Sequence, residues 1–191
     1  VLAAYHGSAA EKVDIYYRDL KKGGPITAIV NDIRAEFTPE LAGDFLFLQT
    51  NWEAPNGRVL RVDLRNPARA NWKTVVPEGP HAIDSIAAAG GKLIVSYLEN
   101  VVSRIKVFDS SGKQTGQIAL PEMGTASVSG RWGDKEAFYS FTSFSTPRSI
   151  YRYDVGSGKQ ELWARVTVPV DTAQIETRQV RMRGIHAHPD P

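Results

Sequence analysis

The sequence predicts an all-β fold, a partial β-propeller. A short apolar strand that ends in aspartate recurs four times, at Asp19, Asp63, Asp109 and Asp154, with steps of 44, 46 and 45 residues. A period of about 40–50 residues is typical of a propeller blade, a four-stranded unit that buries its faces only against neighbouring blades. No stretch longer than about two turns has the 3.6-residue apolar period of a helix.

The inner strands of the blades have continuous apolar runs. In the last three repeats such a run lies around the position sixteen residues before the aspartate, at Phe47, Leu93 and Phe138. Runs of this kind indicate strands covered on both faces. Nine residues after each aspartate another apolar residue marks an outer strand, at Ala28, Trp72, Ile118 and Trp163.

The first strands are the least regular, and we expect them over residues 34–37, 82–86 and 126–129, where small residues suit the crowded centre of a propeller. Residues 1–8 read as a second strand, so we expect the first blade to be incomplete and the chain to be a fragment. The expected propeller part covers residues 1–173, in four blades over roughly 1–30, 31–80, 81–122 and 123–173. Four blades entered in this way predict an open arc.

The repeated aspartates precede turn sequences such as Ser110-Ser111-Gly112-Lys113. An aspartate there can accept hydrogen bonds from the backbone amides that follow and fix the hairpin between the third and fourth strands. A catalytic residue has no reason to recur in every blade, and a calcium loop needs alternating Asp/Asn ligands and a final Glu that are missing here. We therefore predict a structural role.

Composition excludes several classes of function. The 191 residues include 23 Lys and Arg against 21 Asp and Glu, which gives no basis for a nucleic-acid partner. Cysteine is absent, so thiol nucleophiles and thiolate metal sites are excluded. No apolar run is long enough to predict a membrane span. Motifs for a nucleophile elbow, a zinc peptidase, a P-loop or a dinucleotide site are missing, and we predict no catalytic residue and no cofactor.

Three sets of residues are candidates for sites. His186 and His188 have a spacing that could chelate a metal, but no third ligand is near and prolines follow, so a disordered or aberrant tail is preferred. Trp52 and Arg148 belong to connections between second and third strands, and they are the candidates for a substrate-facing loop. Packing against a neighbouring loop is the alternative for Trp52. Surface ion pairing is the preferred role of three arginines that follow these connections: Arg58, Arg104 and Arg148.

Two stretches carry a more specific resemblance. Residues 136–154, which include Phe141-Thr142-Ser143-Phe144-Ser145-Thr146-Pro147, and residues 50–78, which include Thr50-Asn51-Trp52-Glu53-Ala54-Pro55-Asn56, are similar to the propeller of the prolyl oligopeptidase family, peptidase family S9A, in its bacterial members. The likeness runs over about residues 1–180. It implies a seven-bladed propeller, of which this chain would hold four consecutive blades, inserted into an α/β-hydrolase domain.

In that family the hydrolase domain holds a Ser-Asp-His triad and cleaves short peptides after proline, while the propeller covers the active site as a size filter. The resemblance therefore implies short proline-containing peptides and a covalently linked hydrolase domain as partners. It places no triad residue on this chain, which we expect to be inactive alone. The sibling reading is an oligopeptidase B-like propeller, and a stand-alone scaffold that binds peptides or proteins is the alternative from another class.

Two departures from the family pattern stand out. Some members have a basic, peptide-contacting residue where this chain has Trp52, so that role is not carried over. Residues 174–191 should lead toward the hydrolase domain, but residues 181–191 do not match the family's continuation. An aberrant tail, from a frameshift, gene fragment or unnatural terminus, is the leading hypothesis.

Overall fold

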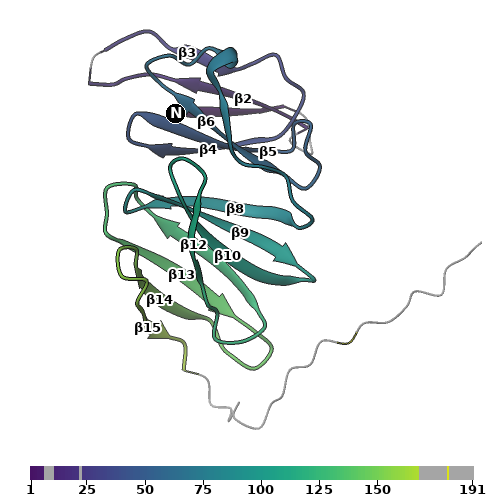
Figure 1. Cartoon of the computed structure of the whole chain (residues 1–191), viewed down its shortest axis with the longest axis vertical. Helices are drawn as coiled ribbons and strands as arrows, with labels where there is room; N and C mark the ends of the chain where they lie inside the picture. The colour runs from purple at the N-terminus through teal and green to yellow at the C-terminus, as the bar shows by residue number, and fades with distance from the viewer. Residues whose placement is uncertain (7–10, 22, 168–179, 181–191) are drawn as a thin grey trace, which may run out of the picture.

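The computed structural model describes residues 1–6, 11–21, 23–167 and 180 (Figure 1). In these residues the chain forms fifteen strands and one short 3₁₀ helix, so the all-β prediction is confirmed. The elements are β1 (Leu2–His6), β2 (Lys12–Tyr17), β3 (Thr27–Val30), β4 (Phe37–Ala42), β5 (Phe45–Thr50), β6 (Arg58–Asp63), η1 (Arg69–Asn71), β7 (Lys73–Val76), β8 (Ala82–Ala89), β9 (Lys92–Glu99), β10 (Val102–Asp109), β11 (Gln114–Ile118), β12 (Thr125–Gly130), β13 (Glu136–Thr142), β14 (Ser149–Asp154) and β15 (Gln160–Arg165).

The strands form four antiparallel sheets in simple sequence order. Three sheets have four strands, β4–β7, β8–β11 and β12–β15, and the described part of the first sheet has three, β1–β3. Asp19 follows β2 as Asp63 ends β6, so β2 takes the third-strand position and β1 the second. The prediction that the first residues form a second strand is thus confirmed.

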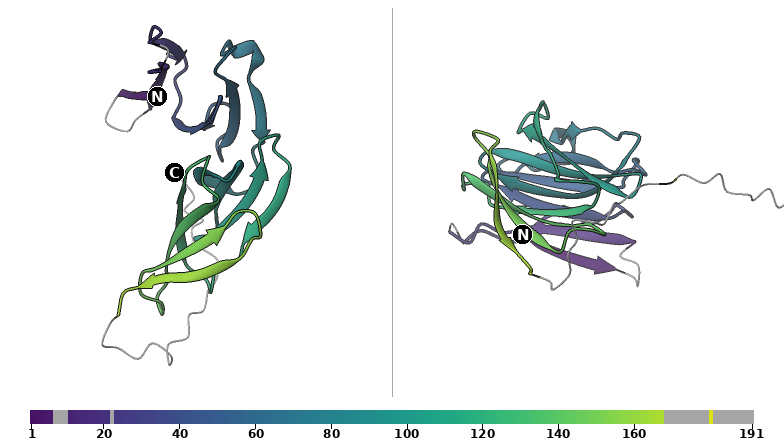
Figure 2. Two further views of the ribbon diagram at one scale, coloured as in Figure 1. Left: turned by 90° about the vertical axis from the view of Figure 1, so that its left-hand side faces the viewer. Right: turned by 90° about the horizontal axis from the view of Figure 1, so that it is seen from below.

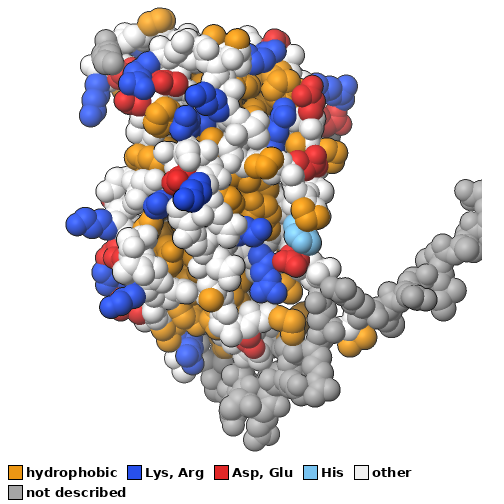
Figure 3. Space-filling view, viewed as in Figure 1, with side chains coloured by type: hydrophobic (Ala, Val, Ile, Leu, Met, Phe, Trp, Pro, Cys, Tyr) orange, Lys and Arg blue, Asp and Glu red, His pale blue; other side chains and the backbone are white. Residues whose placement is uncertain are grey.

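The sheets stack in succession along an arc, from β1–β3 at one end to β12–β15 at the other (Figures 1 and 2). Contacts between the first strands link the last three sheets, because β4 touches β8 and β8 touches β12. Figure 3 shows hydrophobic side chains over the seams between sheets, with Lys and Arg dispersed around them. The first strands are therefore the innermost ones, as expected for blades.

Apolar cores fill the three spaces between successive sheets. In β5, Leu46 and Leu48 are buried against the first sheet, while Phe47 between them is buried against the third. Successive side chains of a strand point to opposite faces, so a strand between two neighbours must be apolar at every position. Each such buried side chain contributes roughly 1.5–3 kcal/mol of hydrophobic stabilisation.

One first strand differs from the expectation. The prediction of a strand over residues 34–37 was wrong, because β4 begins at Phe37 and continues to Ala42. Pro39 and Glu40 make this segment look unlike a strand in the sequence, since both residue types are depleted in strands. Proline is tolerated here because β4 is an edge strand of its sheet and has a partner on one side only.

The antiparallel order sends the connections to two opposite ends of the sheets. Links between second and third strands, and between successive sheets, lie at what we call the loop end: residues 31–36, 51–57, 77–81, 100–101, 119–124 and 143–148. The remaining hairpins lie at the turn end. Contacts within each end support this division, because the Asn56 amide donates to Glu78 at the loop end and the Gly91 amide donates to the Trp132 carbonyl at the turn end.

Candidate functional site

The four repeated aspartates bind the backbone of their own hairpins. Their carboxylates accept hydrogen bonds from the amide nitrogens of Lys21, Arg65, Ser111 and Ser157, at 2.9, 2.9, 2.9 and 2.7 Å. The structural role predicted for these residues is confirmed.

Local hydrogen bonds also set the acidity of these groups. The Arg65 guanidinium donates to both oxygens of Asp63 and lowers the pKa of that carboxyl to about 2. The Ser111 hydroxyl lowers the pKa of Asp109, and the Ser157 hydroxyl does so for Asp154. These carboxylates stay ionised and engaged at neutral pH, so they are poor candidates for proton transfer.

Trp52 at the loop end is half-buried and packed within its own sheet. Its ring meets Trp72 edge to face, with centroids 6.4 Å apart, and the Arg58 guanidinium lies 4.9 Å from its ring centroid. Such aromatic and cation–π contacts each contribute about 0.5–1.5 kcal/mol. The indole is held by the fold.

The three arginines of the loop end divide into two groups. Arg58 pairs with Glu53 at 3.5 Å, and Arg104 pairs with Glu99 at 3.5 Å, which confirms the predicted ion pairing for these two. Arg148 differs, because in the described part of the chain its guanidinium has no ion pair and no hydrogen bond.

A carboxylate fixes the loop that precedes Arg148. Glu122, in the link to the fourth sheet, accepts hydrogen bonds from the hydroxyls of Ser143 (2.5 Å), Ser145 (2.9 Å) and Thr146. The Ser143 hydroxyl bond is the largest cause of a pKa below the ordinary glutamate value. Sequence reasoning missed this cluster. The three hydroxyl residues in 143–146 were the available signal, but nothing local identified their acceptor.

Next to Arg148 lies a hollow of about 320 Å³ between the third and fourth sheets, which we call the charged hollow. Asp84 and Arg148 line it, together with hydroxyl residues that include Ser127 and an apolar side chain, Leu98. Asp84 is the extra residue of a β-bulge in β8, where the register shifts between Ile83 and Ser85. Bulges re-aim side chains, and β4 and β12 pair with their second strands without one. Sequence reasoning placed Asp84 in a first strand and did not single it out.

A second, mainly apolar hollow of about 520 Å³ adjoins the charged hollow, and Thr125 and Thr142 line both. We call it the apolar hollow. Its wall includes Val101 and Phe144, whose side chains are 77% and 93% exposed, and Met123. Val101 has φ +66°, a left-handed conformation that is costly for a β-branched residue and is enriched at functional sites.

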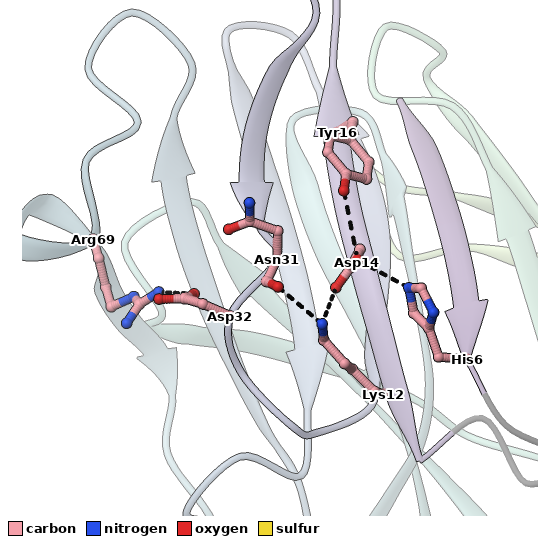
Figure 4. A network of polar contacts seen from close by, with 7 residues as sticks. All are labelled: His6, Lys12, Asp14, Tyr16, Asn31, Asp32 and Arg69. Carbon is pink, nitrogen blue, oxygen red and sulfur yellow. Dashed lines mark hydrogen bonds and ion pairs between the residues drawn. The ribbon is translucent and has the colours of Figure 1, made fainter.

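A separate polar cluster lies on the first sheet, on the opposite face from the core residues Val13 and Ile15. Figure 4 shows Asp14 with His6 and Tyr16 beside it and Lys12 between Asp14 and the Asn31 carbonyl; the ion pair of Asp32 with Arg69 of η1 lies apart from them. The buried Asp14 carboxylate lies 2.9 Å from His6 Nε2 and 3.3 Å from Lys12 Nζ. Burial acts to raise the pKa of Asp14, but the bonds and charges of His6 and Lys12 outweigh it and lower the pKa. The cluster neutralises a buried charge.

Neither a metal site nor a membrane-spanning helix is found among the described residues. No group of three or more His, Cys, Asp or Glu side chains there could hold a metal ion. No helix there is long and apolar enough to cross a membrane. His186 and His188 lie outside the described residues.

Comparison with known proteins gives a consistent result. Residues 1–166 match the model of the prolyl oligopeptidase N-terminal beta-propeller domain. The chain is 31% identical over 169 residues to a prolyl endopeptidase of Elizabethkingia miricola, covering 87% of this chain and 24% of that protein. A solved prolyl endopeptidase structure matches with TM-score 0.81 at 35% identity, over 89% of this chain and 25% of the other.

Oligopeptidase B from Trypanosoma brucei shares the fold, with TM-score 0.72 at 20% identity, over 84% of this chain and 25% of that one. The chain spans about a quarter of the length of the two Elizabethkingia prolyl endopeptidases that it matches.

Proposed function

Because this chain belongs to the prolyl oligopeptidase family through its N-terminal β-propeller domain, we propose that it serves a serine endopeptidase that cleaves short peptides after proline. In this proposal a covalently linked hydrolase domain supplies the Ser-Asp-His triad, and the propeller controls which peptides reach it. The observation that carries the proposal is the 35% identity to a prolyl endopeptidase structure at TM-score 0.81. The structure of oligopeptidase B, which represents the alternative reading, is 20% identical to this chain.

We propose that the chain alone is inactive. A serine peptidase needs a serine hydroxyl hydrogen-bonded to a histidine base. In the described residues His6 is paired with Asp14 and His81 lies 3.7 Å from Glu99, and neither imidazole is bonded to a serine hydroxyl. The contribution of this part is positioning and exclusion.

For the two residues expected to face substrate, we assign different roles. Arg148, whose guanidinium forms no ion pair with another described residue, lines a hollow and is proposed to contact peptide. Trp52 is proposed to stabilise its loop, since its ring is engaged by Trp72 and Arg58.

The test compares this chain with the longest polypeptide that its gene encodes, on chromogenic peptides ending in proline or in arginine. We expect the longer protein to cleave the prolyl peptide, a serine-directed inhibitor to abolish that cleavage, and the chain alone to turn over neither. Preferential cleavage of the arginyl peptide would favour the oligopeptidase B reading. Absence of both activities from the longer protein would favour a stand-alone binding scaffold.

A further inference from the structure

We propose that the charged hollow binds a short zwitterionic peptide, with its ammonium group at Asp84 and its carboxylate at Arg148. This inference deepens the proposed function and rests on it. The first argument is that the hollow presents an acid and a base that do not neutralise each other. Asp84 and Arg148 line the same space without forming an ion pair, although ion pairs join other acids and bases of the loop end.

The second argument is how the two charges are placed. Asp84 is carried by a bulge on an innermost strand, and among the described residues its carboxylate has one long hydrogen bond, from the Ser85 hydroxyl at 3.4 Å. Arg148 directly precedes β14 and ends the loop that Glu122 holds through three hydroxyls. Both charges therefore sit on backbone that is fixed before a ligand arrives, which reduces the entropy lost on binding.

The third argument is size and lining. The charged hollow, at about 320 Å³, lies within the range of small-ligand sites, and its hydroxyls suit the amide groups of a peptide backbone. Arginine binds carboxylates through two parallel hydrogen bonds, and charge-assisted bonds of this kind are about twice as strong as neutral ones. A free amino end and a free carboxyl end, which short peptides carry close together, are the complementary chemistry.

The apolar hollow extends the site. Because Thr125 and Thr142 belong to both hollows, a peptide in the charged hollow has the apolar wall of Val101 and Phe144 beside it. A proline ring or another apolar side chain of the bound peptide fits that wall, and an exposed aromatic ring gives a face for it. The preferred ligand is a tripeptide with an apolar central residue and both termini free.

The experiment is isothermal titration of this chain with Ala-Pro-Ala, its N-acetyl form and its C-terminal amide. Each blocked form is expected to bind about tenfold more weakly, the loss that removing one charged hydrogen bond produces. Asp84→Asn should weaken binding of the free peptide about tenfold and remove the effect of acetylation. Arg148→Gln should do the same for amidation.

Two matched variants at the loop end serve as controls. Glu53→Gln and Arg104→Gln remove charges that are already paired and that do not line the hollow, so they should leave binding unchanged. Phe144→Ser tests the apolar hollow and should weaken Ala-Pro-Ala more than Ala-Gly-Ala. Circular dichroism establishes that each variant is folded.

Equal binding of the free and blocked peptides, or no binding at millimolar concentration by a folded chain, would overturn the proposal. The same holds if the two charge variants leave the blocking effects unchanged. These outcomes can be told apart from a failure of the proposed function, which is decided by peptide cleavage in the longer protein.

Discussion

A close approach between the second and third sheets predicts that replacing one glycine, Gly112, is unusually destabilising. Gly112, in the hairpin after Asp109, has φ +95°, and a Cβ there would lie 2.0 Å from the Val75 carbonyl oxygen. Real Cβ atoms do not approach backbone oxygen so closely, so the alanine must push the hairpin away from β7. The same hairpin is tied to the second sheet by Arg61, which donates to the Ser110 carbonyl at 2.6 Å.

The expected cost of Gly112→Ala has two parts. A left-handed backbone costs an alanine about 1–2 kcal/mol, reduced somewhat because alanine restricts the unfolded chain. Displacing packed backbone adds about 1–3 kcal/mol. The sum, about 2–4 kcal/mol of unfolding free energy, is a large share of the stability of an ordinary domain.

Alanine replacements of two other glycines separate the backbone cost from the cost of displacing packed atoms, when the free energy of unfolding is measured in urea. Gly91 has φ +73° with open space around it, so Gly91→Ala should show the backbone cost alone, about 1 kcal/mol. Gly116 in β11 has neither constraint, and its replacement should be close to neutral or stabilising. If Gly112→Ala were no more destabilising than Gly91→Ala, the close approach to Val75 would be refuted.

Three further predictions concern ionisable groups. Glu122→Gln should lower the free energy of unfolding by about 1–2 kcal/mol, because it weakens the hydrogen bonds from three hydroxyls. Because the folded-state pKa of Glu122 is lowered, its contribution is present above the ordinary glutamate pKa and lost as the pH falls through the folded-state value, so the variant should have a flatter acid unfolding profile. Burial raises the pKa of Tyr139 to about 12. Its contribution to stability is therefore present below about pH 10 and lost as the pH rises toward about 12. In Tyr139→Phe this loss of stability should be absent from alkaline unfolding, and the late ionisation should be absent from the ultraviolet titration. Arg65→Gln should raise the pKa of Asp63 from about 2 toward the ordinary aspartate range, as carbon-13 NMR of the carboxyl would show, and an unchanged value would contradict the assigned hydrogen bonds.

The parts of the fold that sequence could predict are those that local rules dictate. Phe47 stands between two other apolar residues because both faces of β5 are covered by neighbouring sheets. Asp109 directly precedes a turn and accepts a hydrogen bond from a backbone amide of that turn. Arg58 and Arg104 follow a glutamate by five residues across a hairpin connection, so their pairing was also accessible.

The parts that sequence could not predict depend on contacts between distant residues. Glu122 meets hydroxyls that lie 21–24 residues further along the chain, and no local pattern names that partner. The bulge that re-aims Asp84 arises from one unpaired residue in β8. The alternation of apolar residues in a strand can be read from its sequence more reliably than its pairing register with the neighbouring strand. Pro39 conceals β4 because the sequence alone does not tell that this strand is an edge.

The candidate site is best recognised by asking which charges the fold already uses. At the turn end, Asp63 and Asp109 hold their hairpins, and at the loop end Glu53, Glu99 and Glu122 are engaged by arginines or hydroxyls. Exposed surface charges are common and carry no meaning by themselves. Asp84 and Arg148 differ because they are opposite in sign, line one hollow and form no ion pair with each other. β-Bulges are over-represented next to functional sites, and here a bulge carries an aspartate whose carboxylate forms no ion pair with another described residue.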